Sequence, residues 1–214
     1  MTKLKQRKFL VGALVIIVAL FIQACGGQLA PQEPCNFVQN SQFQRVSWQA
    51  RVPVKIYLHS SVPYTYYSAI EGAIEEWNQA LGKEVLRLEL TGVGGYPLPS
   101  RDGANVIYRL NTWEENRRLE QARTTLYWAG NRIYEADIRL NGRYFRFYKG
   151  DDGSGGGGFS GVDLRSLMVH ELGHVLGFSH NDRKDSVMYK TLPSGTLRRK
   201  LGKKDVASAK CEYK

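Results

Sequence analysis

Histidine is scarce in this sequence, and several other features are missing. Only four of the 214 residues are histidine. There are no internal repeats, and the longest apolar run, residues 9–22, has 14 uncharged residues, whereas a membrane-spanning helix needs about twenty. No aromatic residue interleaves with the basic stretch LRRKLGKK, and no nucleic-acid-binding module is visible. The sequence therefore argues against a nucleic-acid partner.

The composition is that of a globular chain with unevenly placed charge. Hydrophobic residues make up 43% and charged residues 23%, which suits one domain with an appendage. The net charge is +10, and residues 183–214 hold ten Lys and Arg against three Asp and Glu. This basic segment could meet an anionic lipid or polymer, but we interpret it as a solvated face that keeps the protein soluble.

Alternating and helical apolar patterns predict an α/β or α+β domain with a mixed sheet. The predicted strands are residues 52–59, 85–90 and 105–110, and the two arms of a hairpin, 124–128 and 132–140, around an Ala-Gly-Asn turn. The predicted helices are residues 66–82, 163–177 and about 203–213. Gly82 and Gly177 are expected to end the first two helices, and Asp163 to cap the start of the second.

Three of the four histidines lie in the stretch HELGHVLGFSH, residues 170–180. On a helix, His170 and His174 are four residues apart and project from one face, so both imidazoles can bind one ion. Gly177 can adopt a positive φ, which lets the chain turn so that His180 supplies a third ligand. Three neutral imidazoles leave a fourth position open for water, which is the pattern of a catalytic zinc.

Glu171, next to the first of these histidines, is predicted to be a general base. It is poorly placed to bind the ion beside His170, but it can reach a water held by the metal. Zinc lowers the pKa of such a water towards about 7 and polarises a substrate carbonyl. Glu171 can take the proton of that water and pass it to a leaving amine. The motif therefore predicts hydrolysis of peptide bonds.

The full pattern HExxHxxGxxH resembles that of the metzincin metallopeptidases. The stretch DSVMYK places Met188 eight residues after His180, which looks like the methionine turn of that family; Met188 would then form an apolar floor without binding the metal. Within the metzincins the chain is most similar to the matrixins. This resemblance implies a zincin-like fold with a twisted mixed sheet, an active-site helix, the methionine turn and a C-terminal helix.

The matrixin resemblance assigns further residues. Tyr189 is expected to line the pocket just past the scissile bond rather than to bind zinc, and Lys190 replaces the proline of the family's Met-Tyr-Pro. The stretch LGKKDVASAKCEY resembles the C-terminal helix, with Asp205 as its acidic residue. YEADIRL, residues 134–140, resembles the edge strand that pairs with an extended substrate. Matrixins hold a structural zinc largely by upstream histidines; only His59 lies upstream here, so we expect no such site and a packing or surface role for His59.

The N-terminus is predicted to be an export signal. MTKLKQRK is followed by the apolar run and by QACGG, the order of a secretory signal peptide. Residues 22–25, IQAC, resemble the lipobox of bacterial lipoproteins, with Gln23 in place of the usual small residue. The resemblance implies cleavage before Cys25 and lipidation of that cysteine. An uncleaved signal anchor and ordinary secretion are the alternatives.

The expected organisation follows from these motifs. We expect a lipoprotein signal peptide at 1–24, a tether at 25–47 and a metzincin-like catalytic domain at 48–214. The mature protein would be exported and lipid-anchored to a bacterial membrane, facing outward in the cell envelope.

The other two cysteines, Cys35 and Cys211, bracket most of the predicted domain. Disulfides form in exported proteins, and a bridge would close a loop of about 175 residues and tie both termini to the domain. In the alternative, Cys35 blocks the metal as a thiolate, as the propeptide cysteine of matrix metalloproteinases does. EPCNFVQ matches that switch sequence only at its Pro-Cys step, so we favour the disulfide.

Together the motifs predict a monomeric zinc-dependent endopeptidase that holds one catalytic ion and acts on proteins or peptides. The alternatives are a membrane-tethered, zinc-containing binding lipoprotein without turnover and a hydrolase of cell-wall peptides. Glu171 favours an enzyme, because a pure binding protein needs no carboxylate aimed at the open metal position. Asp151 and Asp152, in a glycine-rich stretch interpreted as a flap, could bind calcium, but their spacing matches no calcium-binding loop.

Overall fold

The computed structural model describes residues 33–150 and 161–214. The predicted signal peptide, the lipidation site Cys25, and Asp151 and Asp152 lie outside the described residues. Within the described ranges, no helix is long and apolar enough to cross a membrane.

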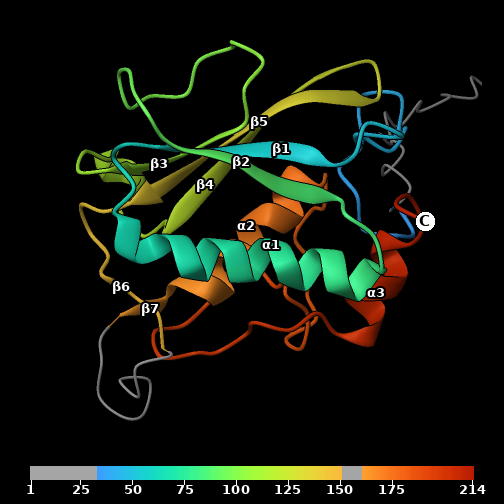
Figure 1. Ribbon diagram of the computed structural model, residues 1–214. Helices are drawn as coiled ribbons and strands as arrows, with labels where there is room; N and C mark the ends of the chain where they lie inside the picture. The colour runs from blue at the N-terminus through green and yellow to red at the C-terminus, as the bar shows by residue number, and fades with distance from the viewer. Residues whose placement is uncertain (1–32, 151–160) are drawn as a thin grey trace, which may run out of the picture. The chain divides into compact units, whose positions relative to one another are not determined.

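A five-stranded mixed sheet forms one layer of the domain (Figure 1). Its strands in spatial order are β2 (Leu86–Val93), β1 (Val54–His59), β3 (Val106–Leu110), β5 (Arg132–Asn141) and β4 (Ala122–Ala129). The first four run parallel to one another, and β4 is antiparallel to β5. This mixed sheet confirms the predicted fold class, and each predicted strand corresponds to one of the five.

At the hairpin end of the sheet the edge strand is β4, and the prediction that YEADIRL forms the edge was wrong. YEADIRL lies in β5, which is hydrogen-bonded to β3 on one side and to β4 on the other. The pattern of a hairpin does not say which arm continues the sheet. Here β5 takes the inner position because residues on both of its faces are buried, among them Ala136, Asp137 and Ile138, as inner strands require.

Two helices pack against one face of the sheet. α1 (Tyr67–Leu81) ends at Gly82, which has a φ of 70° and so terminates the helix in the left-handed conformation that glycine favours. α2 (Leu164–Val175) begins after Asp163, whose side chain accepts a hydrogen bond from the Ser166 backbone N–H at 2.8 Å. This N-cap satisfies one of the unpaired amide groups at the helix start.

The remaining elements are short. They are η1 (Tyr64–Tyr66), η2 (Glu115–Arg117), β6 (Phe147–Tyr148), β7 (Val162–Asp163) and α3 (Lys203–Ala209). α3 ends before the predicted limit at residue 213. After Ala209 the chain is no longer helical, and the buried Tyr213 donates a hydrogen bond from its hydroxyl to the Leu176 carbonyl at 2.5 Å.

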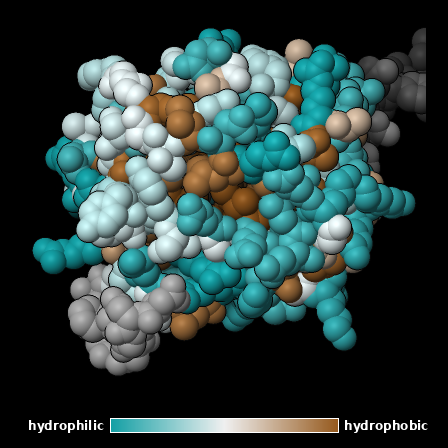
Figure 2. All heavy atoms as spheres, viewed as in Figure 1, coloured by the Kyte–Doolittle hydropathy of each residue, from teal (hydrophilic) through white to brown (hydrophobic). Residues whose placement is uncertain are grey.

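The hydrophobic core lies between the sheet and the two long helices. α1 contributes Ile70, Ala73, Ile74 and Trp77, all buried and spaced as the sequence predicted. The Trp77 indole donates to the Val169 carbonyl of α2 at 2.9 Å and so links the two helices. The core is covered from solvent. Figure 2 shows that the face turned to the viewer in Figure 1 is mostly hydrophilic, with small hydrophobic areas near its centre.

The opposite face of the sheet also buries two carboxylates of β5. Glu135 Oε2 accepts from the Gly103 backbone N–H at 2.6 Å, and Asp137 Oδ1 accepts from the Val106 backbone N–H at 3.0 Å. Burial raises the pKa of Asp137 to about 7, because the charged form loses hydration. The polar alternation of β5 therefore does not mark a solvated face.

The structure corrects the expected tether over residues 33–47. Phe37 and Val46 are buried in the core, and a disulfide joins Cys35 to Cys211 with 6.4 Å between their Cα atoms. Two apolar side chains and a crosslink hold this segment on the domain, so the tether does not extend to residue 47. The Cys35 sulfur is bonded to Cys211 and is not a thiolate that blocks a metal.

Candidate metal centre

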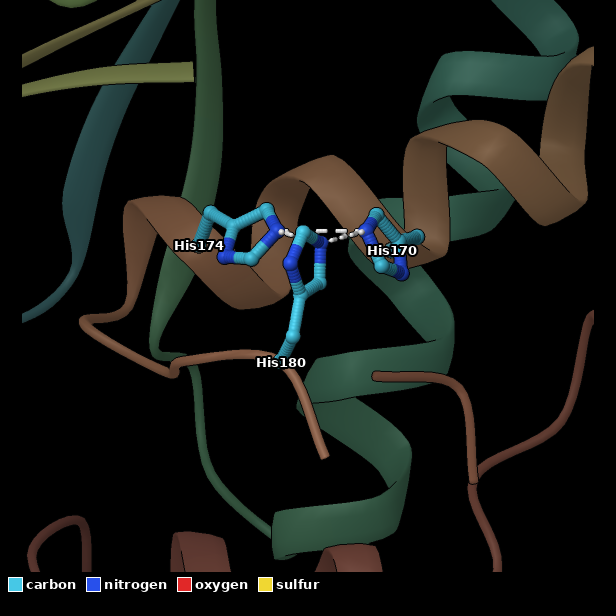
Figure 3. Close-up of side chains that lie close together, drawn as sticks. All are labelled: His170, His174 and His180. Carbon is cyan, nitrogen blue, oxygen red and sulfur yellow. Dashed lines mark hydrogen bonds between the residues drawn. The ribbon is translucent and has the colours of Figure 1, made fainter. Parts of the chain in front are cut away.

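α2 and the segment after it bring three histidine side chains together (Figure 3). His170 and His174 project from α2, and His180 approaches from the chain that follows Gly177. Gly177 has a φ of 98°, and a Cβ there would lie 2.5 Å from the Val46 carbonyl oxygen, so this turn requires glycine. The three Nε2 atoms are 3.1 Å apart in every pair.

This donor set fits a metal cation. Nδ1 of His170 and Nδ1 of His174 lie 2.7 Å from the carbonyl oxygens of Val187 and Phe178; a carbonyl only accepts, so each Nδ1 carries the proton. The facing Nε2 atoms of these two rings therefore present lone pairs, which repel unless a cation lies between them. Tetrahedral zinc at about 2.0–2.1 Å from each nitrogen would separate its ligand nitrogens by about 3.3 Å, close to the observed spacing.

The electrostatics favour the neutral imidazoles that metal binding needs. Burial lowers the pKa of His170 and of His174 to about 4, and it also lowers the pKa of His180. All three rings are then unprotonated on one nitrogen at neutral pH, the form that binds a metal. Among the described residues, no other three His, Cys, Asp or Glu side chains lie close enough to hold one ion. The three histidines fit a zinc site.

Glu171 lies beside this centre, and its carboxylate accepts a hydrogen bond from the edge strand β4. The Thr124 hydroxyl of β4 donates to Glu171 Oε2 at 2.6 Å. Burial raises the pKa of the Glu171 carboxyl, against the lowering effects of His174 and of the Thr124 hydrogen bond. A raised pKa suits a group that takes a proton and returns it. The Thr124 bond engages one carboxylate oxygen and leaves Oε1 for another partner.

Met188 lies directly beneath α2. It is buried, and a Cβ added to Gly173 would lie only 2.3 Å from the Met188 sulfur. Because Gly173 has no side chain, the helix can pack closely against the methionine. The Met188 sulfur packs against the helix at Gly173; its role as an apolar floor for a metal stays a prediction.

The turn that carries Met188 is anchored by the buried Asp205 of α3. Its Oδ1 accepts from the Ser186 hydroxyl at 2.5 Å and from the Arg183 guanidinium at 2.9 Å, and its Oδ2 accepts from the Val187 backbone N–H at 3.1 Å. Hydrogen bonds to an ionised acceptor are the stronger kind. α3 thereby fixes the position of the methionine against Gly173 of α2.

The centre opens into a cleft of about 990 Å³. Its walls include the three histidines, Glu171, residues of β4 and the segment Tyr189–Pro193. Tyr189 is half-buried in this wall, with the Arg198 guanidinium carbon 5.5 Å from its ring centroid. Gln121 Nε2 donates to the Leu192 carbonyl at 2.8 Å and ties the start of β4 to the opposite wall.

The sequence contained no signal for three residues that support this site. Each makes a hydrogen bond to a residue far away in the sequence. The separation is 47 residues from Thr124 to Glu171, 71 from Gln121 to Leu192 and 143 from Asn36 to Ser179. Threonine, glutamine and asparagine are common in turns and strands, so only their tertiary partners identify them.

His59 is not part of the centre. It is buried, its Nδ1 accepts from the Ser61 backbone N–H at 2.9 Å, and its ring lies 5.1 Å from that of Tyr108. The structure therefore places His59 as a packing residue, one of the two roles that the sequence allowed.

Comparison with known proteins identifies the family. The Matrixin family model matches residues 68–214, which include α1 except its first residue, the four sheet strands β2 to β5, the three histidines and α3. The chain therefore belongs to the matrixin family, a group of metzincins. The metzincin resemblance read from the sequence is confirmed.

Individual relatives match over a shorter stretch. The chain is 44% identical over 52 residues to Metalloendoproteinase 4-MMP of Arabidopsis thaliana, which covers 24% of this chain and 15% of that protein. It is 40% identical over 52 residues to Metalloendoproteinase 2-MMP of Arabidopsis thaliana, covering 24% and 14%. It is 38% identical over 47 residues to Metalloendoproteinase 1 of Glycine max, covering 22% and 15%. The chain thus matches a small part of the length of these relatives.

Proposed function

We propose that the protein is a zinc-dependent endopeptidase that cleaves proteins or peptides. The observation that carries this proposal is the Glu171 carboxylate, buried beside three converging imidazoles in an open cleft. Membership of the matrixin family and the names of the relatives, which are metalloendoproteinases, support it. A binding protein without turnover would have no use for a buried carboxylate at this position.

The edge strand provides a binding mode for the substrate. In the described sheet, β4 has a neighbouring strand only on its β5 side, so its outer edge can pair with an extended peptide. Tyr189 and Leu192 line the same cleft as β4 and would contact the side chain just past the scissile bond. Pairing along β4 would carry the peptide carbonyl past the histidines.

The chain's own residues account for the proton transfers. His170, His174 and His180 would hold a zinc ion, which when bound polarises the carbonyl and acidifies a water. Glu171 would take the proton of that water on Oε1 and deliver it to the leaving amine. Thr124 would keep the carboxylate oriented through Oε2 during both transfers.

We further propose that the chain is exported and anchored through a lipid on Cys25, as a monomer at the outer side of a bacterial membrane. The basic start, the 14-residue apolar run and IQAC support this proposal. The Cys35–Cys211 disulfide agrees with an oxidising compartment.

The general-base role is tested by Glu171→Ala in full-length protein purified in detergent. Hydrolysis of a quenched-fluorescent peptide library, with and without a zinc chelator, is measured together with zinc per chain. We expect chelator-sensitive cleavage by the wild type, and a loss of about 10²–10⁴-fold or more in the variant, which still binds one zinc. The exposed Glu75 gives the control, and Glu75→Ala should cleave as the wild type does.

Two results would contradict the proposal. Cleavage that persists in Glu171→Ala would remove the general-base role. A wild type that binds one zinc per chain and cleaves nothing in the library would favour the binding lipoprotein.

A further inference from the structure

The segment that lies next to the metal centre on its His180 side comes from outside the matched matrixin region. Residues 33–47, here called the N-terminal strap, precede the family match, which begins at residue 68. The strap begins at the same end of the domain as α3 and the C-terminus (Figure 1). A feature of this chain rather than of the matched region therefore contacts the metal-binding loop.

The strap pairs with the loop that joins α2 to His180. The Val38 backbone N–H donates to the Gly177 carbonyl at 2.8 Å, and the Ser179 backbone N–H donates to the Asn36 carbonyl at 2.9 Å. The Asn36 side-chain Nδ2 donates to the Ser179 carbonyl at 2.6 Å. Asn36 thus engages both backbone groups of the residue that immediately precedes the third histidine.

His180 depends on its backbone more than the other two histidines do. His170 and His174 each have a ring nitrogen bonded to a backbone carbonyl. In the described part of the chain, the ring of His180 has no bond of this kind. Its backbone is held from both sides instead, by Asn36 at Ser179 and by the bond from the Asn181 N–H to the Met188 carbonyl at 3.0 Å.

The strap is itself firmly attached. Cys35, next to Asn36, is bonded to Cys211, and the buried Phe37 ring lies 4.3 Å from that of Phe178. Glu33 Oε2 accepts from the Phe37 backbone N–H at 2.8 Å. A covalent bond and a buried ring on either side of Asn36 fix the position from which its amide reaches Ser179.

We propose that the N-terminal strap completes the metal centre, with Asn36 as the positioning residue for His180 and the Cys35–Cys211 disulfide as its anchor. This rests on the proposed zinc site. Zinc affinity would then require the strap to be docked, and the centre would reach full affinity only after the disulfide has formed. Partners that orient metal ligands commonly contribute 10–100-fold to metal affinity.

The test measures zinc affinity rather than turnover. Metal-free, full-length protein is titrated with zinc in competition with a chromogenic chelator. Asn36 has a φ of 64°, a conformation that glycine adopts readily, so Asn36→Gly removes the amide without straining the backbone. We expect it to weaken zinc binding about tenfold. Asn36→Asp, which turns an oxygen towards the Ser179 carbonyl, should weaken it more.

The matched control is Gln39→Ala, in the same strap. Among the described residues, the Gln39 side chain makes one hydrogen bond, from its Nε2 to the Phe43 carbonyl of the strap at 2.9 Å, so its loss should leave zinc affinity unchanged. The double variant Cys35→Ser with Cys211→Ser should weaken zinc binding several-fold, because the hydrogen bonds still hold part of the strap. The Tm of each metal-free variant separates a loss of the metal site from a loss of the fold.

The outcomes separate this proposal from the proposed function. Wild-type zinc affinity in Asn36→Gly would overturn the role of Asn36, whatever the enzyme cleaves. Weakened affinity with an unchanged Tm would support it, even in a protein without peptidase activity. A wild type that binds no zinc would overturn both proposals.

Discussion

His170 and His174 are positioned by one helix, whereas His180 is positioned by contacts from two other parts of the chain, one on each side of it in the sequence. The first two share a face of α2, and their spacing follows from helical geometry. His180 lies between Ser179, which is bonded to Asn36, and Asn181, which is bonded to Met188. The candidate metal centre therefore combines a locally determined pair of histidines with a third that only the tertiary structure places.

This difference predicts unequal losses when ligands are removed, and these are the largest effects we expect. His174→Ala breaks the helical pair and should abolish stoichiometric zinc binding. His180→Ala leaves the pair intact and should retain a weak site. Structural zinc contributes about 10–16 kcal/mol in small domains, so the loss of either histidine should weaken zinc affinity by more than about 100-fold. Chelator competition on full-length protein measures both variants.

Equal zinc affinities in the two variants would contradict the comparison, since the helical pair would then have no advantage. Stoichiometric zinc in His174→Ala would contradict the ligand set itself. Mean residue ellipticity of both variants checks that α2 remains folded.

A smaller effect, on catalysis rather than on zinc binding, is expected at Thr124, which lies in the sheet and is not one of the histidines. Thr124→Val keeps the shape but removes the hydroxyl that orients Glu171. We expect kcat to fall about tenfold with KM and zinc content unchanged, because the substrate and the metal lose no contact. Steady-state kinetics on a peptide substrate measures the two constants.

Thr124→Ser restores the hydroxyl and should recover most of the lost kcat. Thr125→Val, on the neighbouring position of β4, is the matched control and should change little. If Thr124→Ser is as impaired as Thr124→Val, the methyl group matters and the hydrogen bond does not.

The smallest effect on the metal centre should come from Asp137, which is on the opposite face of the sheet from the helices. Burial raises its pKa from 3.8 to about 7, so between these values the folded protein holds a proton that the unfolded chain has released. The free energy of unfolding should therefore fall as pH rises from about 4 through 7. Asp137→Asn should remove this component of the pH dependence without changing zinc affinity.

Urea unfolding of wild type and Asp137→Asn across that pH range gives the difference between the two profiles. Other titrating groups are common to both proteins and cancel in this difference. A difference that does not vary with pH would show that Asp137 is already ionised in the folded state.

Much of the fold was predictable because its signals are local. The apolar spacing of α1, the Asp163 cap and Gly82 marked the helix limits, and alternating residues marked all five strands. The order of β4 and β5 was not predictable, since both arms of a hairpin alternate and only burial on both faces distinguishes the inner one. The docking of residues 33–47 was also hidden, because polar and proline-containing composition resembles that of a tether.

The sequence by itself determined the helix-borne histidines His170 and His174, the adjacent Glu171, the glycine that turns the chain towards His180, and Met188 after it. These depend on spacing along one stretch of about twenty residues, where helical geometry converts sequence distance into spatial distance. Only the tertiary structure decided that Thr124 meets Glu171, that Asp205 anchors the methionine turn and that Asn36 holds the residue before His180. Those contacts join positions 18 to 143 residues apart, and no local pattern records which distant segments the packed core will bring together.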